Sequence, residues 1–218
     1  MKVKNKKIEI FQSITDLMTS LFVVFLLLLL VYINKNYHDI HKASQNSKQA
    51  LIYALSKIKI NAFNDSKDPL AVIIPIRNDL LLFDKDKSDI KLSGELYLKG
   101  FIVKLLNVIT QYNFQDDISS IEVDGFTDSD GDDEHNLRLS QDRSYSVLKY
   151  ILQSGLLTKN NRDYLLGILS TNGQGERFLL PPNSTPGLEN KFLSRRVEFK
   201  IKLKSYEQKN LISNSLVK

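Results

Sequence analysis

The sequence predicts an α+β protein with a single N-terminal transmembrane helix, a helical linker and a C-terminal α/β sandwich domain. An uncharged apolar run lies between Leu17 and Ile33. Apolar residues at helical spacing follow it, and from Leu70 onward strand-like and helix-like runs alternate. The expected parts are a cytoplasmic tail over 1–13, the transmembrane helix over 14–33, the linker over 34–68, the sandwich over 69–204 and a C-terminal tail over 205–218.

The seventeen residues from Leu17 to Ile33 carry no charge. At 1.5 Å per residue they span about 25 Å, whereas a hydrocarbon core is roughly 30 Å thick. Extending the helix back to Ile14 closes this gap and brings Asp16 to the membrane edge. The alternative is a cleaved signal peptide, but the run is long and no small-x-small cleavage site follows it. The run therefore predicts a retained anchor.

Lysines are denser before the predicted span than after it. The first seven residues hold four of them, namely Lys2, Lys4, Lys6 and Lys7. Because the more basic flank tends to stay in the cytoplasm, we expect a cytoplasmic N-terminus and 185 residues on the outer side. In a bacterium with two membranes, this predicts a single-pass inner-membrane protein with a periplasmic C-terminal domain.

Asp16 is the candidate ion site of the membrane helix. Gln12, Asp16, Thr19 and Ser20 share one helical face, because they are three or four residues apart. A protonatable carboxylate beside hydroxyl groups can bind and release a proton or a small cation. The alternative is structural, because Ser13 and Asp16 also form the pattern of a helix-capping box.

The predicted linker has an amphipathic pattern. Apolar residues such as Leu51, Leu55 and Ile58 recur at helical spacing, and the segment from Asn64 to Pro69 interrupts the pattern. The interpretations that remain open are a spacer helix, a short dimer seam and a plug that seals an idle channel.

The outer part of the chain alternates between strand and helix patterns. Strand patterns cover 70–76, 121–125 and 197–203, helix patterns cover 92–112 and 139–153, and short apolar runs cover 80–83 and 165–170. This alternation favours an α/β sandwich with helices on one face of a sheet.

Composition and spacing argue against several functions. The net charge of +5 comes from scattered lysines without a nucleic-acid-binding motif, so we expect no nucleic-acid partner. The chain has no cysteine, and its three histidines lack ligand spacing, so we expect neither a metal site nor a cofactor. The acidic stretch after Asp128 fails the calcium-loop pattern, which has Gly rather than Asp133 and Glu rather than Leu139. No nucleophile–base arrangement is evident, so we expect no enzyme activity.

Two segments carry a specific resemblance. Residues 121–148 read IEVDGFTDSDGDDEHNLRLSQDRSYSVL, and residues 194–199 read SRRVEF. They resemble the OmpA C-terminal family, the peptidoglycan-binding domain that is also found in MotB proteins. That family has Gly-His-Thr-Asp after a strand, then Asn-x-x-Leu-Ser-x-x-Arg opening a helix, and finally Asn-Arg-Arg-Val. This chain departs from the pattern at two positions, with Phe126 in place of the His and Ser194 in place of the last Asn.

The resemblance implies a site for the diaminopimelate of a peptidoglycan stem. A carboxylate and a guanidinium suit the ammonium and carboxylate groups of this zwitterion. By the family pattern these groups are Asp128 and Arg143. The other implied binding residues are Thr127, Asn136, Arg195 and Arg196. The structural alternative is that Asp128 and Arg143 form only a stabilising salt bridge.

A membrane aspartate joined to such a domain resembles the B subunit of MotA/MotB-type ion-driven motors. This resemblance implies a homodimer inside a ring of MotA-like subunits, with H⁺ or Na⁺ passing Asp16 beside Thr19 and Ser20. The divergent membrane segment favours the ZorB subunits of Zorya anti-phage systems, with a ZorA-like ring, over flagellar MotB. A passive wall anchor without ion conduction is the alternative.

Overall fold

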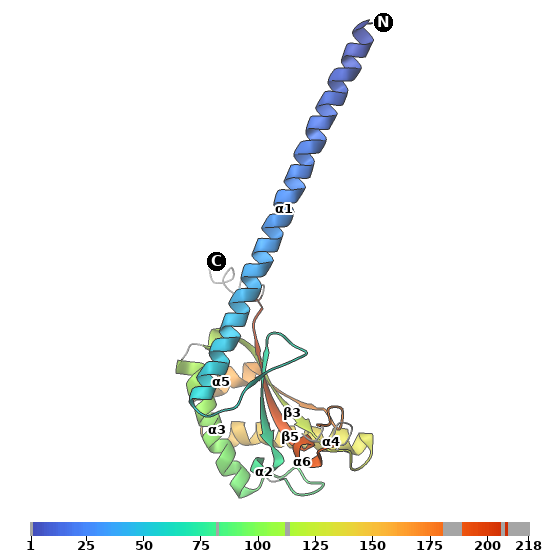
Figure 1. Ribbon diagram of the computed structural model, residues 1–218. Helices are drawn as coiled ribbons and strands as arrows, with labels where there is room; N and C mark the ends of the chain where they lie inside the picture. The colour runs from blue at the N-terminus through green and yellow to red at the C-terminus, as the bar shows by residue number, and fades with distance from the viewer. Residues whose placement is uncertain (1, 82, 112–113, 181–188, 206–207, 209–218) are drawn as a thin grey trace. The chain divides into compact units, whose positions relative to one another are not determined.

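The computed structural model describes residues 2–81, 83–111, 114–180, 189–205 and 208, apart from the side chains of 2–13, 36–44, 81 and 111. By its internal contacts, the chain divides into two units. The first comprises Met1–Ala43 and the second Ser44–Lys218. Each unit is described by itself (Figure 1).

The long helix α1, Lys2–Lys57, forms the described part of the first unit and continues into the second. Neither Gly nor Pro occurs in α1, so no residue in it breaks the hydrogen-bond ladder. The segment Ile14–Lys35 is long and apolar enough to cross a membrane, and its side chains are exposed to the surroundings. This segment contains the span expected over 14–33, and together with the folded second unit it fits a single-pass membrane protein.

The last turns of α1 belong to the second unit. Leu51 and Leu55 are fully buried in its apolar core, and the Lys48 ammonium donates a hydrogen bond of 2.8 Å to the Pro69 carbonyl. The helix ends at Lys57, Lys59 follows with a left-handed φ of 62°, and the Ile60 N–H returns to the Leu55 carbonyl at 3.0 Å. The chain from Ser44 onward, which the sequence places in a linker, is therefore packed with the domain.

Five strands form one sheet in the described part of the second unit, in the order β1-β2-β5-β3-β4. Neighbouring strands are antiparallel except β3 and β4, which are parallel. The strands are β1 (Phe63–Asn64), β2 (Ala71–Arg77), β3 (Ile118–Phe126), β4 (Leu169–Gly173) and β5 (Arg196–Leu203).

The sheet forms one layer of the second unit, and the helices form the other. They are the end of α1, α2 (Asn78–Leu81), α3 (Leu92–Gln111), α4 (Asp133–Gln153), α5 (Lys159–Ile168) and α6 (Lys191–Ser194), with a 3₁₀ turn at Phe114–Asp116 (Figure 1). Side chains of α3, α4 and α5 meet those of β3, β4 and β5 in one apolar core, as at Ile109, Ile151, Leu165, Ile121 and Phe199. The expected α/β sandwich is confirmed.

The alternation along β5 separates two environments. Val197, Phe199 and Ile201 are buried under the helices. On the other face, Lys200 pairs with Asp65 at 2.6 Å, and Lys202 with Glu122 at 3.2 Å. The charged face therefore carries ion pairs along the strand. This alternation of buried and charged residues is the period-two pattern from which the strand was predicted.

Helix α4 lies unusually close to β3 and β4, because glycines stand where the two layers touch. A Cβ atom on Gly125 would lie 2.1 Å from the Ser140 carbonyl oxygen, and one on Gly173 would lie 2.6 Å from the Leu137 carbonyl oxygen. The Ser140 hydroxyl accepts a hydrogen bond of 2.9 Å from the Gly175 N–H. These contacts set the depth at which α4 presents its side chains beside the end of β3.

We predict that Gly125→Ala lowers the free energy of unfolding by about 3 kcal/mol, because neither backbone can move away without disturbing the core. The matched control is Gly100→Ala in α3, where a Cβ would meet nothing within 4 Å. This control should be neutral or stabilise by up to about 1 kcal/mol. Denaturant unfolding of the full chain in detergent measures both. Equal stability of the two variants would contradict the close-contact explanation.

Candidate functional site

The site begins where β3 ends and the chain turns into α4. Thr127 and Asp128 follow the strand, and the Thr127 N–H donates to the Gly175 carbonyl at 3.0 Å. Asp132 then caps α4, because its carboxylate accepts a hydrogen bond of 2.8 Å from the His135 N–H. The acidic stretch thus includes a helix cap and the turn that holds Asp128.

A polar cavity of about 40 Å³ lies between this turn, the first half of α4, the segment after α2 and the start of β5. Its volume accommodates about three water-sized groups, which is the scale of one ammonium or carboxylate rather than of a whole ligand. Five of the six residues predicted to bind peptidoglycan line it. They are Thr127, Asp128, Asn136, Arg143 and Arg195.

Asp128 contributes an acceptor that is not fully used. The residue is only 6 % exposed, and its Oδ1 atom accepts a hydrogen bond of 3.4 Å from the Asp130 N–H. The Oδ2 atom is buried without a hydrogen bond, although the Nε atom of Arg195 lies 3.5 Å away. The Thr127 hydroxyl is likewise buried without a partner. Such groups cost free energy unless something pairs with them, so the cavity is suited to a hydrogen-bond donor.

Arg143 supplies the opposite charge from α4. Its Nε atom donates to the Lys87 carbonyl at 3.0 Å and its Nη2 atom to the Asp84 carbonyl at 3.2 Å. The guanidinium also lies 5.2 Å from the Phe83 ring centre. Because neutral carbonyls hold it, its charge is not cancelled by a directly bonded carboxylate. Its Nη1 atom makes no hydrogen bond within the described residues and can serve a ligand.

The electrostatic environment of Arg143 is mixed. Burial lowers the pKa of its guanidinium, and the nearby charge of Arg195 lowers it further, whereas Asp128 and Asp86 raise it. Arginine still stays protonated at any physiological pH. The cavity therefore places a permanent cation and a carboxylate in one small space.

Asn136 positions the acidic turn. It is 1 % exposed, and its amide donates to the Asp128 carbonyl at 3.3 Å and to the Glu176 carboxylate at 3.0 Å. This side chain connects α4, the turn after β3 and the loop after β4. Its interactions are therefore with the protein framework around the cavity.

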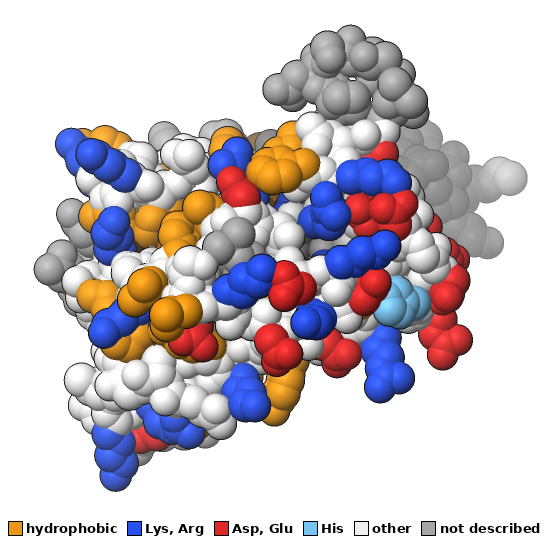
Figure 2. Space-filling view, turned by 90° about the horizontal axis from the view of Figure 1, so that it is seen from below, with side chains coloured by type: hydrophobic (Ala, Val, Ile, Leu, Met, Phe, Trp, Pro, Cys, Tyr) orange, Lys and Arg blue, Asp and Glu red, His pale blue; other side chains and the backbone are white. Residues whose placement is uncertain are grey.

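Lys85 and Asp86 also line the cavity and were not predicted from the sequence. They lie in the segment after α2, which also supplies the two carbonyls that hold Arg143. Asp86 has a left-handed φ of 55°, and its carboxylate lies 3.3 Å from the His135 ring. The alternating charges of residues 84–89 were the available signal. Figure 2 shows Lys and Arg side chains interspersed with Asp and Glu around a histidine.

Neighbouring contacts hold the acidic turn from the other side. The Ser129 hydroxyl donates to the Glu189 carboxylate at 2.5 Å, and Lys191 pairs with Asp130. The short helix α6 and the residues before it therefore brace the turn that carries Asp128.

Arg196 does not line the cavity, unlike its neighbour Arg195. Its guanidinium pairs with Glu198 at 2.6 Å, donates to the Phe178 and Ser194 carbonyls, and lies 3.9 Å from the Phe126 ring centre. Phe126 thus provides a surface on which Arg196 stacks. The predicted binding role of Arg196 has no geometric counterpart in this cavity.

The predicted ion site lies in the first unit. Asp16 is exposed on α1. The Thr19 hydroxyl donates to the Thr15 carbonyl at 2.7 Å, and the Ser20 hydroxyl donates to the Leu17 carbonyl at 2.9 Å. Both hydroxyl protons are used within the helix, so their oxygens remain available as acceptors for a cation or a water molecule.

Comparisons with known proteins find a family and several similar chains. The OmpA family matches residues 82–191. Outer membrane protein A of Bordetella avium is 32% identical over 133 residues, which are 61% of this chain and 59% of that protein. A photosystem I P700 chlorophyll a apoprotein A2 of Gloeobacter violaceus is 31% identical over 126 residues, which are 56% of this chain and 13% of that protein. The chain therefore spans less than two thirds of the length of these relatives.

Solved structures with a similar arrangement include the periplasmic domain of Helicobacter pylori MotB. It is 22% identical and has a TM-score of 0.48, covering 70% of this chain and 94% of that one. The cell wall anchor of the type VI secretion system (T6SS) from Pseudomonas aeruginosa is 14% identical and has a TM-score of 0.45, covering 71% and 96% respectively.

The two neighbouring arginines should respond differently to removal. We predict that Arg196→Ala lowers the free energy of unfolding by about 3 kcal/mol, because it leaves Glu198 mostly buried and unpaired. Arg195→Ala should lower it by less, about 1 kcal/mol, because Arg195 is 40% exposed along its side chain and lies 3.5 Å from the Asp128 carboxylate without a hydrogen bond to it. Denaturant titration of each full-length variant tests this. A larger loss from Arg195→Ala would contradict the assignment.

Proposed function

Because this chain belongs to the OmpA family, we propose that its folded domain binds peptidoglycan through the cavity beside Asp128 and Arg143. The ligand group is the free end of diaminopimelate in a peptide stem, which carries one ammonium and one carboxylate. Asp128 accepts hydrogen bonds from the ammonium, and Arg143 donates to the carboxylate. Thr127 and Arg195 also line this cavity.

The observation that carries this proposal is the unsatisfied Oδ2 atom of Asp128 in a cavity that Arg143 also lines. If the two residues served only as a salt bridge, they would pair with each other. Instead, Arg143 hydrogen-bonds main-chain carbonyls, and the Asp128 Oδ2 atom, 3.5 Å from the Arg195 Nε atom, accepts no hydrogen bond. A zwitterion gives Asp128 a donor and Arg143 an acceptor at once.

The departures from the family pattern fit the same proposal. Phe126 stands where the family has a histidine, and its ring stacks with Arg196 rather than lining the cavity. Stem recognition therefore depends on the residues that do line the cavity. Asn136 acts mainly by orienting the turn, because its amide donates to the Asp128 carbonyl.

For the whole chain, the proposed role is the peptidoglycan-anchored B subunit of a MotA/MotB-like ion-driven motor in the bacterial inner membrane. Two copies dimerise, and their membrane helices lie inside a ring of MotA-like subunits. H⁺ or Na⁺ passes through Asp16, with Thr19 and Ser20 lining its path. The support is an aspartate at the edge of an apolar span, with two hydroxyl groups on the same helix face.

Among such motors, we favour the ZorB subunit of a Zorya anti-phage system, with a ZorA-like ring, over a flagellar stator. The support is the short and divergent membrane segment, which lacks tryptophan. A passive cell-wall anchor shares the folded domain but needs no function for Asp16, so substitution of this aspartate separates the two classes.

The peptidoglycan proposal predicts that Asp128→Asn or Arg143→Ala weakens binding of a diaminopimelate-containing stem peptide by roughly 10–100-fold. This is the effect of losing one charge-assisted hydrogen bond. Asp142→Asn provides the matched control, because Asp142 is exposed on the same helix one residue from Arg143. Binding is measured by calorimetry on the full chain in detergent.

Unfolding midpoints measured in parallel show that the variants are folded. Binding that survives both substitutions in folded protein would refute the proposed site.

The motor proposal predicts that Asp16→Asn abolishes phage protection, or motility if the motor is flagellar, while the membrane complex still assembles. The charge that binds and releases the ion is lost, whereas the size of the side chain is kept. The control is Asp39→Asn, which changes the other aspartate of the first 43 residues. Both phenotypes are assayed in the native operon, with a pull-down of the complex. If Asp16→Asn leaves both phenotypes unchanged, the chain is a passive anchor.

A further inference from the structure

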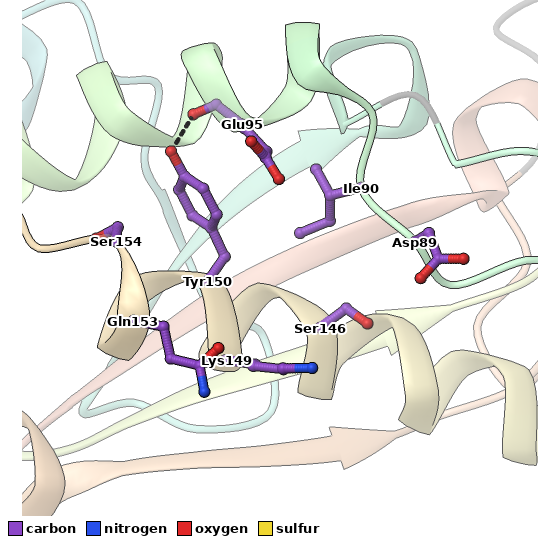
Figure 3. A pocket seen from close by; sticks show the side chains of 8 residues that line it. All are labelled: Asp89, Ile90, Glu95, Ser146, Lys149, Tyr150, Gln153 and Ser154. Atoms are coloured by element: carbon purple, nitrogen blue, oxygen red, sulfur yellow. Dashed lines mark hydrogen bonds between the residues drawn. The ribbon is translucent and has the colours of Figure 1, made fainter.

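A second and larger cavity lies farther along α4. It is a groove of about 320 Å³ between the first turn of α3 and the second half of α4, with the segment before α3 at one end (Figure 3). A volume of this size is at the lower end of those that hold small molecules. The cavity beside Asp128 and Arg143, called the stem cavity below, is too small for more than one end group, so a longer ligand would need further space outside it.

The walls of the groove are partly apolar and partly polar. The Tyr150 hydroxyl donates a hydrogen bond of 2.8 Å to the main-chain carbonyl of Glu95, which holds the ring between the two helices (Figure 3). The half-buried Ile90 adds an apolar side chain. Around them are the ammonium of Lys149 and the amide of Gln153, both exposed.

This combination suits a carbohydrate better than a peptide end or a lipid. A sugar ring offers an apolar face, which packs on an aromatic or aliphatic side chain, and a rim of hydroxyl groups that both donate and accept hydrogen bonds. The groove supplies acceptors at Glu95 and Asp89, a donor at Lys149 and both functions at Gln153. An acyl chain would leave these polar groups without partners.

The position of the groove relative to the stem cavity is set by shared elements. The segment that supplies Lys85 and Asp86 to the stem cavity continues to Asp89 and Ile90 in the groove. Along α4, Arg143 belongs to the stem cavity, and Lys149 and Gln153 belong to the groove. At 1.5 Å per residue, these two lie about 9 and 15 Å beyond Arg143 along the helix axis.

We propose that the groove binds the muramyl sugar of the same peptidoglycan unit whose diaminopimelate enters the stem cavity, an inference that rests on the proposed function. In such a unit, the rest of the diaminopimelate, two amino acids and a lactyl group separate its free end from the sugar, a distance of about 14 Å when extended. This reach brings the sugar to a level between Lys149 and Gln153. The domain then holds the stem tip and the glycan strand at two places, which fixes the direction of the strand across α4.

The test compares two ligands on the full chain in detergent: a diaminopimelate tripeptide and the same tripeptide attached to N-acetylmuramic acid. Wild-type protein should bind the sugar-bearing ligand about tenfold more tightly, the equivalent of one additional hydrogen bond at its upper strength. The double variant Lys149→Ala/Gln153→Ala should reduce this ratio to about one. Any effect of the variant on the tripeptide itself cancels in the ratio.

Lys104→Ala is the matched control, because Lys104 is exposed on α3 and lines neither cavity. It should leave the ratio unchanged. A wild-type ratio near one with normal tripeptide binding would overturn the groove assignment alone, as would a ratio that the double variant leaves intact. Absence of binding of both ligands to wild-type protein would overturn the proposed function together with this inference.

Discussion

The contact between α4 and the two parallel strands is the constraint on which the site depends. Because Gly125 and Gly173 have no side chains, the α4 backbone lies directly against β3 and β4. Ser140 then reaches the loop after β4 through its bond to the Gly175 N–H. This arrangement places Arg143 on α4 beside Asp128, which follows β3, so the two charged groups line one cavity although fifteen positions separate them in the chain.

Three arginines show how the surroundings decide the role of a charge. Arg196 is neutralised by Glu198 and stacked on Phe126, so its contribution is to stability. Arg195 is partly exposed and approaches Asp128 without hydrogen-bonding it. Arg143 is buried but held by neutral carbonyls, which orient the guanidinium and leave its charge for a ligand. Burying a cation in this way is costly unless a partner anion completes the site, and the proposed stem carboxylate is that anion.

The sequence was informative wherever a pattern is local. The alternation at Val197, Phe199 and Ile201 predicted β5, and helical spacing predicted α3 to within one residue of its end. The motif residues Asp128 and Arg143 were predicted together because the family pattern contains both positions at a fixed spacing. Leu51 and Leu55 were predicted to be on a helix, but their burial depends on long-range packing, so the sequence placed them in a linker.

Other features depend on contacts that no local pattern encodes. Lys85 and Asp86 enter the site through the path of one segment, and Arg196 leaves it because Glu198 and Phe126 are nearer partners. The groove beside Tyr150 is formed jointly by α3, α4 and the segment before α3. In each case the side-chain type was visible in the sequence, but its neighbours were not.

The proposed recognition of a zwitterion depends on two opposite charges in one small cavity. The most direct measurement varies the ligand rather than the protein, with three stems compared in calorimetry against the full chain. One stem carries diaminopimelate, one carries diaminopimelate with its free carboxylate amidated, and one carries lysine, which has the ammonium alone. We predict that the first binds at least about tenfold more tightly than either of the others, because both lack the partner of Arg143. Equal affinity for the three stems would show that Arg143 does not bind a stem carboxylate and would contradict the proposed site.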